Sequence, residues 1–167
     1  MSIFAESEVV DLCRELIRID TSNYGDNSGP GERKAAEYVA EKLADVGIDS
    51  IIVESAPGRA NVLARWGNQN SSKPGLLIHG HLDVVPAEAS DWKLPPFAGE
   101  VSDGYVHGRG AVDMKDFDAM LLAVVRERQT SGRIPDRPIT LAFTADEEAG
   151  SVQGANWLVE HHREWFE

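Results

Sequence analysis

His81 and Asp83 have the residue types and the spacing of a metal ligand and the carboxylate that orients it. They follow the apolar run Leu76-Leu77-Ile78, which predicts a short buried strand. If the extended chain continues, both side chains point the same way, because side chains alternate along a strand. The carboxylate would then fix the imidazole and raise its basicity. A strand end with two solvated polar residues fits the same pattern.

A second candidate segment runs from Gly108 to Asp116. Gly108 and Gly110 allow a tight backbone turn, and Asp113 stands just before a pattern typical of a helix. There the carboxylate could bind a metal ion, and its two oxygens could bridge two cations. The alternative is that Asp113 is a helix N-cap, which is a common role for aspartate.

The third segment, Asp146-Glu147-Glu148, directly follows the apolar run Leu141-Ala142-Phe143. Three successive acids repel one another, and in a cleft their pKa values would rise unless a cation lay among them. The alternative is a solvated loop, which is the usual place for a run of acids. The apolar strand before the run favours the cleft, because it carries the acids to the end of a buried element.

The three segments share one property: each lies at a junction between predicted elements, where open α/β sheets bind their ligands. Imidazole and carboxylates together form a ligand set suited to Zn²⁺, Co²⁺ or Mn²⁺. No thiolate occurs in these segments, which argues against a cysteine-based structural zinc site. A carboxylate beyond the ligands could take a proton from a metal-activated water, so the segments predict metal-assisted hydrolysis.

The elements that must position these residues alternate between helical and extended patterns. Apolar spacing predicts helices over 6–19, 32–46, 113–131 and 151–162, and strands over 50–54, 60–66, 76–78 and 139–143. Residues 23–31 predict a surface loop, and the irregular stretch 86–110 could hold a hairpin with Asp103-Gly104 at its turn. This alternation indicates an α/β fold with helices on both faces of a sheet.

Composition narrows the classes of function. The 167 residues suffice for about one domain, and 28 acidic against 16 basic residues give a net charge of −12, which argues against a nucleic-acid surface. No membrane span is expected, because no apolar run reaches about 18 residues. The first residues lack the pattern of a secretory signal, and the single cysteine, Cys13, suits a reducing compartment, so we expect a cytoplasmic protein.

Taken together, the segments resemble the motifs of a family of dinuclear zinc hydrolases. This is the family of aminoacylase-1, carboxypeptidase G, acetylornithine deacetylase, succinyl-diaminopimelate desuccinylase and related dipeptidases. Residues 80–86, 108–115 and 146–150 resemble its first, second and third motifs, in the same order and with similar spacing. The resemblance implies a three-layer α/β/α sandwich with a mixed, largely parallel sheet. It also implies two Zn²⁺ ions in a complete site, with Co²⁺ or Mn²⁺ as substitutes.

The resemblance implies a role for each of five side chains. His81 would bind one zinc ion, and Asp83 would hold His81 in place. Asp113 would bridge both ions, and Glu148 would bind the same ion as His81. Glu147 would be the general base that takes a proton from the water between the metals. The implied function is zinc-dependent hydrolysis of an amide bond in a dipeptide or an N-acyl amino acid.

The chain departs from this family at one position and in length. Asp116 stands where the family usually has glycine, and its carboxylate suits the first turn of a helix. Family members are more than twice as long, so residues 1–167 are expected to be the N-terminal part of the catalytic domain. A C-terminal catalytic segment with further ligands, and a lid domain through which the full-length protein could dimerise, would then be absent.

Two other interpretations stay open. A truncated, catalytically inactive α/β fragment could bind metal weakly or act as an interaction module, and a purely structural acidic domain would bind none. The remaining polar residues and Cys13 are weaker candidates for the site. We expect His79 to have a backbone partner, Arg109 either to support its turn or to touch substrate, Asp118 and Asp136 to be solvated, and Cys13 to lie in the core.

Overall fold

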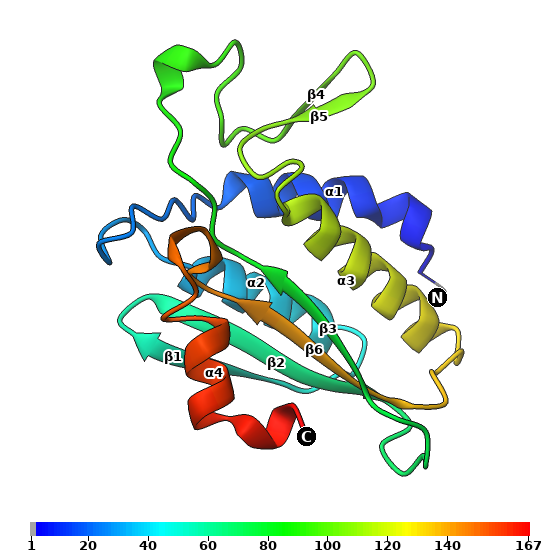
Figure 1. Ribbon diagram of the computed structural model, residues 1–167. Coiled ribbons are helices and arrows are strands. Elements are labelled where there is room, and N and C mark those ends of the chain that lie inside the picture. The colour runs from blue at the N-terminus through cyan, green and yellow to red at the C-terminus, as the bar shows by residue number, and fades with distance from the viewer. Residues whose placement is uncertain (1–2) are drawn as a thin grey trace.

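Four strands form one mixed sheet in the order β1-β2-β6-β3 (Figure 1). The computed structural model describes residues 3–167. The strands are β1 (Ser50–Ala56), β2 (Arg59–Gly67), β3 (Leu76–His81) and β6 (Pro138–Thr144). The α/β class and the mixed sheet are therefore confirmed.

The expectation of a largely parallel sheet is not met in this chain. Only β3 and β6 pair in parallel, whereas β1 with β2 and β2 with β6 are antiparallel. The cause lies partly in the connection, because the two residues Pro57-Gly58 between β1 and β2 can only reverse the chain, and a parallel pair needs a long crossover. The pair β3 and β6 has such a crossover, which contains α3.

Helices cover both faces of the sheet, as predicted. They are α1 (Ala5–Arg18), α2 (Arg33–Ala44), α3 (Lys115–Thr130) and α4 (Ala155–His161). The first three share one apolar core with the sheet, whereas Leu158 of α4 packs against Leu63 and Ala142 on the opposite face. Consecutive strand residues alternate between the two cores, which gives three layers.

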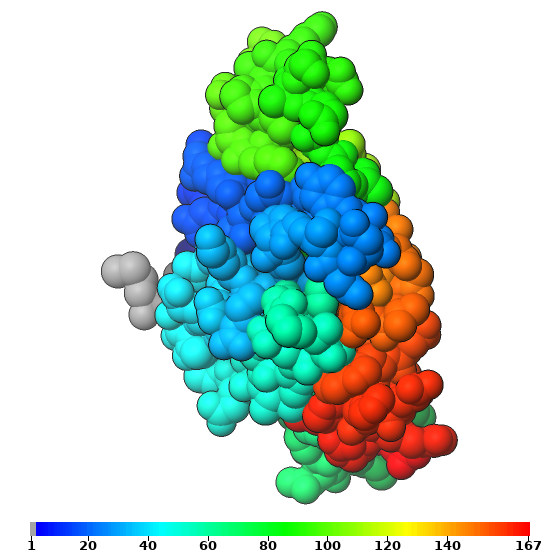
Figure 2. Space-filling model, turned by 90° about the vertical axis from the view of Figure 1, so that its left-hand side faces the viewer, coloured from blue at the N-terminus to red at the C-terminus, as the bar shows by residue number. Residues whose placement is uncertain are grey.

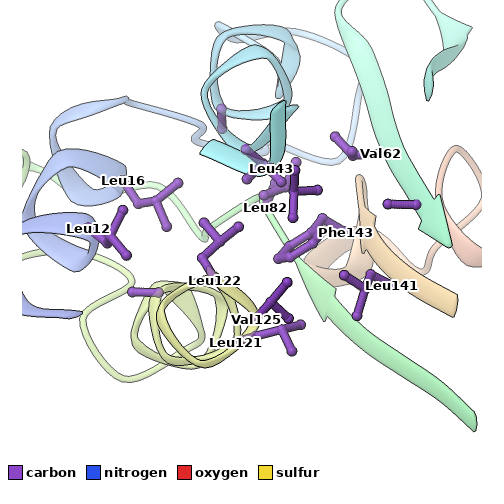
Figure 3. Close-up of a cluster of buried hydrophobic side chains, with 14 of the residues drawn as sticks. Leu12, Leu16, Leu43, Val62, Leu82, Leu121, Leu122, Val125, Leu141 and Phe143 are labelled. Carbon is purple, nitrogen blue, oxygen red and sulfur yellow. The ribbon is translucent and has the colours of Figure 1, made fainter. Parts of the chain in front are cut away.

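The larger core lies between α1, α2, α3 and the sheet. Figure 3 shows Leu16 of α1, Leu43 of α2 and Leu122 of α3 converging on Phe143 of β6. All four side chains are fully buried. Since β6 is at the centre of this packing, the position of its carboxyl end is fixed by the bulk of the fold.

A two-stranded hairpin projects from this body beyond α1 (Figures 1 and 2). Its strands are β4 (Glu100–Ser102) and β5 (Tyr105–His107), and the predicted turn residues Asp103 and Gly104 both have positive φ, at 53° and 82°. Short 3₁₀ turns complete the fold: η1 (Ala89–Asp91), η2 (Glu147–Ala149) and η3 (Arg163–Trp165). None of the helices in residues 3–167 combines the length and apolar character needed to span a bilayer.

Candidate active site

The carboxyl ends of β3 and β6 place two of the three motif segments side by side. These strands run parallel, with His81 opposite Thr144, so the residues that follow both strands leave the sheet at the same edge. Asp83 follows β3, and the turn η2 with Glu147 and Glu148 follows β6. The third segment reaches the same edge from the turn that precedes α3.

His81 lies at the centre of the acidic residues. Its side chain is 5% exposed, and its Nε2 is 3.0 Å from Asp113 Oδ1 and 3.8 Å from Glu147 Oε2. Its Nδ1 is 3.0 Å from the backbone oxygen of Asp83 and 3.5 Å from Asp83 Oδ1. With the Nδ1 proton donated to Asp83, Nε2 is the nitrogen that can bind a metal ion.

The structure brings together the residues that the sequence predicts as metal ligands. His81, Asp113 and Glu148 each offer a ligand atom within 4.8 Å of the others, and no other group of this kind is found in residues 3–167. His81 is buried, Glu148 is half-buried and Asp113 is 74% exposed on its side chain. One imidazole and two carboxylates form a donor set that fits Zn²⁺ and similar ions.

Asp83 joins the end of β3 to the turn η2. Its fully buried carboxylate accepts the backbone N–H groups of Glu147 at 3.0 Å and Glu148 at 3.1 Å, and the side-chain amide of Asn23 at 2.8 Å. Burial acts to raise the pKa of Asp83, but hydrogen bonds from His81, Asn23 and these N–H groups outweigh it and hold the pKa below its usual value. Asp83 is therefore a fixed negative charge behind His81.

The charges around His81 favour a cation. Burial lowers the pKa of His81, but its contacts with Asp83 and Asp113 outweigh burial and raise the pKa to about 9. Burial also raises the pKa of Glu148, and repulsion from Asp113, Asp83 and Glu147 adds to this rise. A divalent ion bound to His81 and the carboxylates would replace the imidazole proton and relieve that repulsion.

The structural alternatives for Asp113 and the acid run do not match the geometry. The helix α3 begins at Lys115, its N-cap position is Met114, and no side chain caps it, so Asp113 is not an N-cap. The run 146–148 is not a freely solvated loop either, because Asp146 is buried and the N–H groups of the next two residues bind Asp83.

A group of buried polar residues, of which the sequence singles out only Asp146, lies directly behind the turn η2. Asn23, Glu32, Arg59 and Asp146 are all less than about a tenth exposed and are connected to one another and to Asp83. Asn23 belongs to the segment predicted as a surface loop, and its burial corrects that prediction for the start of the loop. A backbone pairing causes it, since Ser22 forms a parallel bridge with Val84 and Asn23 N–H donates to the Val84 oxygen.

Asp118 is not solvated, which corrects another expectation. It is fully buried on α3, where a Cβ atom added at Gly80 of β3 would collide with its Oδ1, and neither oxygen has a hydrogen-bond partner among the described residues. Burial raises the pKa of Asp118 well above its ordinary value. The reason is helical geometry: Asp118 lies one turn before Leu122, on the stripe of α3 that faces the sheet.

The predictions for four other residues had different outcomes. His79 Nε2 lies 2.8 Å from the hydroxyl of Thr144, which is a side chain and not the expected backbone partner. Asp136 is solvated and pairs with Lys73, and Cys13 is buried in the core, as predicted. The Arg109 guanidinium lies over the Trp92 ring at 5.2 Å, and its backbone N–H donates to the Pro96 oxygen, which fits a role in supporting this stretch.

Hollows of the molecular surface also lie away from the acidic cluster. Two of them, of about 450 and 460 Å³, are both lined by Arg65 and Trp165, and the first also by the amino ends of β3 and β6. Neither contains one of the predicted site residues. A metal ion requires converging donor atoms more than a large cavity, and these atoms converge at His81.

Sequence comparison links the chain to known hydrolases. Residues 77–167 match the family described as "Peptidase family M20/M25/M40". Aminoacylase-1 of Sus scrofa is 33% identical over 155 residues, which are 92% of this chain and 37% of that protein. Succinyl-diaminopimelate desuccinylase of Roseobacter denitrificans is 37% identical over 135 residues, or 78% of this chain and 34% of that enzyme. The chain thus spans little more than a third of the length of these relatives.

Solved structures share the same fold. Human carnosine dipeptidase 1 matches with a TM-score of 0.77 at 24% identity, over 96% of this chain and 36% of its own. An M20 family metallo-carboxypeptidase from Sulfolobus solfataricus matches with a TM-score of 0.79 at 22% identity, over 95% of this chain and 35% of its own. These matches extend across almost all of the chain, so the three-layer arrangement described above is common to them.

Proposed function

The chain belongs to peptidase family M20/M25/M40, and on this premise we propose that it carries the metal site of a zinc-dependent hydrolase. Its reaction would cleave an amide bond in a dipeptide or an N-acyl amino acid. The observation that carries the proposal is the convergence of His81, Asp113 and Glu148, whose ligand atoms lie within 4.8 Å of one another.

Three side chains would hold the metal, and a fourth would orient one of them. His81 Nε2, Asp113 and Glu148 are the proposed ligands, and Asp113 has a second oxygen with which to reach a second ion. Zn²⁺, for which Co²⁺ or Mn²⁺ could substitute, would act as a Lewis acid that polarises the substrate carbonyl and lowers the pKa of a bound water. Asp83 would keep the His81 imidazole in the tautomer and orientation that present Nε2 to the metal.

Glu147 would be the general base. Its carboxylate lies 3.8 Å from His81 Nε2 and is 47% exposed, so it borders the ligands and remains open to substrate. It would take the proton from the attacking water and return it to the nitrogen of the leaving amine. Glu147 and Glu148 can have different roles because Glu148 belongs to the group of converging ligand atoms and Glu147 does not, while Asp83 holds both of their backbone N–H groups.

The substrate class rests on the relatives. Their names refer to an aminoacylase, a desuccinylase and a dipeptidase. A dipeptide and an N-acyl amino acid present the same amide carbonyl to a metal and a base, so the residues near His81 do not choose between them. We propose both as one substrate class, with selectivity set by parts of the longer relatives that this chain does not match.

The domain assignment is also a proposal. We propose that residues 1–167 form the N-terminal part of the catalytic domain, because the relatives are almost three times as long as the segment they share with this chain. A lid domain, further ligands for the second ion and a homodimer interface would belong to the remainder. The buried Cys13 suits a reducing, cytoplasmic setting.

A hydrolysis assay with metal removal tests the function. The purified protein would be treated with a chelator, reloaded with Zn²⁺ or Co²⁺, and assayed with a panel of dipeptides and N-acetyl amino acids. We expect hydrolysis that disappears with the chelator and returns with the metal. Hydrolysis that survives complete metal removal, or a protein that binds no metal, would overturn the proposal.

A second candidate is an inactive fragment that binds metal weakly or serves as an interaction module. It is favoured by the limited coverage of the relatives and by the exposure of Asp113, which leaves one side of the ligand group open. The same assay separates the two candidates. Zn²⁺ binding without turnover on any substrate of the panel would support the inactive fragment.

A further inference from the structure

We propose that Asn23 and Arg59 are positioning residues of the metal site. They belong to a buried polar chain of five side chains, Glu32, Arg59, Asp146, Asn23 and Asp83, which runs behind the turn η2 and ends at His81. The inference rests on the proposed function and extends it, because Asn23 and Arg59 lie outside the three motif segments and are not proposed to touch metal or substrate.

Asn23 connects two carboxylates through a single amide group. Its Nδ2 donates to Asp83 Oδ2 at 2.8 Å and to Asp146 Oδ1 at 3.0 Å, which uses both of its protons. Its Oδ1 accepts the Gly25 N–H at 3.0 Å, which fixes the orientation of the amide. Asn23 is therefore fully engaged and holds the carboxylates of Asp83 and Asp146 at a defined separation.

The position of Asn23 is set by the backbone. The segment before it runs parallel to the chain that follows β3: Val84 N–H donates to the Thr21 oxygen, and Asn23 N–H donates to the Val84 oxygen at 2.8 Å. The Thr21 hydroxyl also donates to the Leu82 oxygen at 2.7 Å. These bonds attach Asn23 to the same stretch that carries His81 and Asp83.

Arg59 supplies the positive charge of the buried polar chain. Its side chain is 2% exposed at the start of β2, and its Nη2 lies 2.9 Å from Asp146 Oδ1 and 3.1 Å from Glu32 Oε1. A buried carboxylate without a cation is costly, so the guanidinium of Arg59 offsets the cost of burying Asp146. Glu32, which is itself fully buried, is a second carboxylate within ion-pair distance of the same Nη2 atom.

Asp146 transmits this arrangement to the turn η2. It has positive φ, at 63°, which aspartate tolerates, and its Oδ2 accepts the Gln153 N–H at 2.9 Å. Its side chain thereby ties the residue before Glu147 to the chain beyond the turn. Since Asp83 holds the N–H groups of Glu147 and Glu148, the turn is fixed from both ends by carboxylates that Asn23 joins.

These hydrogen bonds connect the position of Asn23 to the positions of the ligand atoms. A shift of the Asn23 amide would move Asp83, which orients His81, and Asp146, which shapes the turn that carries Glu148. Loss of such indirect support of metal ligands typically lowers metal affinity or activity by about 10- to 100-fold. The effect should be seen in metal binding itself, before any catalytic step.

The test is the affinity for Zn²⁺ alone, measured by titration calorimetry on the metal-free protein. Asn23→Asp keeps the size of the side chain and the oxygen that accepts from Gly25. It replaces the N–H₂ group with an oxygen, so that a third carboxylate faces those of Asp83 and Asp146 and no proton is donated to either. Asn23→Ala removes the donors without adding charge, so it carries the test if the first variant does not fold. We expect both variants to bind Zn²⁺ about 10- to 100-fold more weakly than the original protein. The affinity of Arg59→Lys for Zn²⁺ should lie between that of the original protein and that of the Asn23 variants.

Two controls separate positioning from general stability. Val125→Ala removes core volume in α3, a helix that contributes no residue to the polar chain, and should lower the unfolding temperature without weakening Zn²⁺ binding at a temperature where the protein is folded. Asn68→Asp adds the same charge at an exposed position and should have no effect on affinity. An affinity loss in Val125→Ala equal to that in the Asn23 variants would overturn the inference.

The outcomes also separate this inference from the proposed function. If the original protein binds Zn²⁺ and the Asn23 variants bind it equally tightly, the positioning role is wrong and the metal site stands. If the original protein binds no Zn²⁺, the metal site is wrong, and the positioning role falls with it.

Discussion

His81 Nε2 lies 3.0 Å from Asp113 Oδ1, although 32 residues separate them in the chain. The contact forms because β3 delivers His81 to the sheet edge that the turn before α3 also reaches. Asp113 contributes little to folding, since its side chain is 74% exposed and does not cap the helix. An exposed acid aimed at a buried imidazole is better explained by a shared cation than by stability.

Removal of the Asp113 carboxylate should therefore affect metal binding and leave the fold intact. We expect Asp113→Ala to lower Zn²⁺ affinity by more than about 100-fold, because a direct ligand contributes more than an indirect support. Its unfolding temperature in chelator should stay within a few degrees of the original protein. Asp116→Ala, a neighbouring acid in the first turn of α3, is the matched control and should bind Zn²⁺ normally. Equal affinity in both variants would remove Asp113 from the ligand set.

Substitutions of the adjacent residues Glu147 and Glu148 should differ in their effect on bound metal. Glu147→Gln should lower kcat by about 10²- to 10⁴-fold, the usual contribution of a general base, while bound Zn²⁺ is retained. Glu148→Gln should lose metal affinity first and activity as a consequence. Elemental analysis of each variant beside its kcat makes the comparison. A Glu147→Gln variant with full activity, or one that has lost its metal, would contradict the assigned roles.

Asp83 should link stability to metal binding. In Asp83→Asn one carboxylate oxygen becomes an N–H₂ group that cannot accept from the backbone of η2, so a buried N–H is left without its partner. We expect this to lower the free energy of unfolding in chelator by about 1–3 kcal/mol. Zn²⁺ affinity should also fall, because the imidazole of His81 loses its fixed partner. Urea unfolding and calorimetry on the same sample measure both effects, and a change in neither would contradict the role of Asp83.

Asp118 predicts a pH dependence of stability that can be measured on the metal-free protein. Burial raises the pKa of Asp118 in the folded protein, so ionisation is disfavoured there and not in the unfolded chain, where the pKa is about 3.9. The folded state therefore loses stability as pH rises above about 4, until the folded pKa is passed. Asp118→Asn removes this titration and should be more stable than the original protein at neutral pH, with a smaller difference near pH 4.

Urea unfolding at pH 4 and at pH 8, both in chelator, measures the Asp118 effect. Asp136→Asn is the matched control, because this carboxyl is exposed and paired with Lys73, and its removal should change stability little in either direction. An Asp118→Asn variant that is less stable than the original protein at pH 8 would show that the ionised carboxylate has a stabilising partner.

Regular patterns in the sequence predicted the main elements of the fold. The predicted helix 6–19 corresponds to α1, and 113–131 corresponds to α3, with boundaries within two residues. The predicted helix 151–162 is shorter, because Ser151 has positive φ and Gly154 has the non-helical backbone angles φ −108° and ψ −116°, so α4 begins only at Ala155. The spacing of apolar residues along the chain does not reveal such backbone conformations.

The site residues also divide into those that a local sequence pattern reveals and those that depend on tertiary contacts. The residues of the three motifs could be proposed because their types and order carry a pattern. Asn23 and Arg59 could not, because each is a single polar residue beside a turn, and its burial depends on tertiary pairing. Asp118 did carry a signal: it lies on the apolar stripe of its helix, where a charge is unexpected, and this spacing argued against solvation.

The most direct test of the account is a crystal structure of the protein from crystals grown with Zn²⁺, in which anomalous scattering locates the ion. The account predicts a zinc ion at about 2.0–2.2 Å from His81 Nε2 and from carboxylate oxygens of Asp113 and Glu148. An ion bound elsewhere, or a His81 imidazole turned away from Asp113 and Glu148 in zinc-saturated crystals, would contradict it.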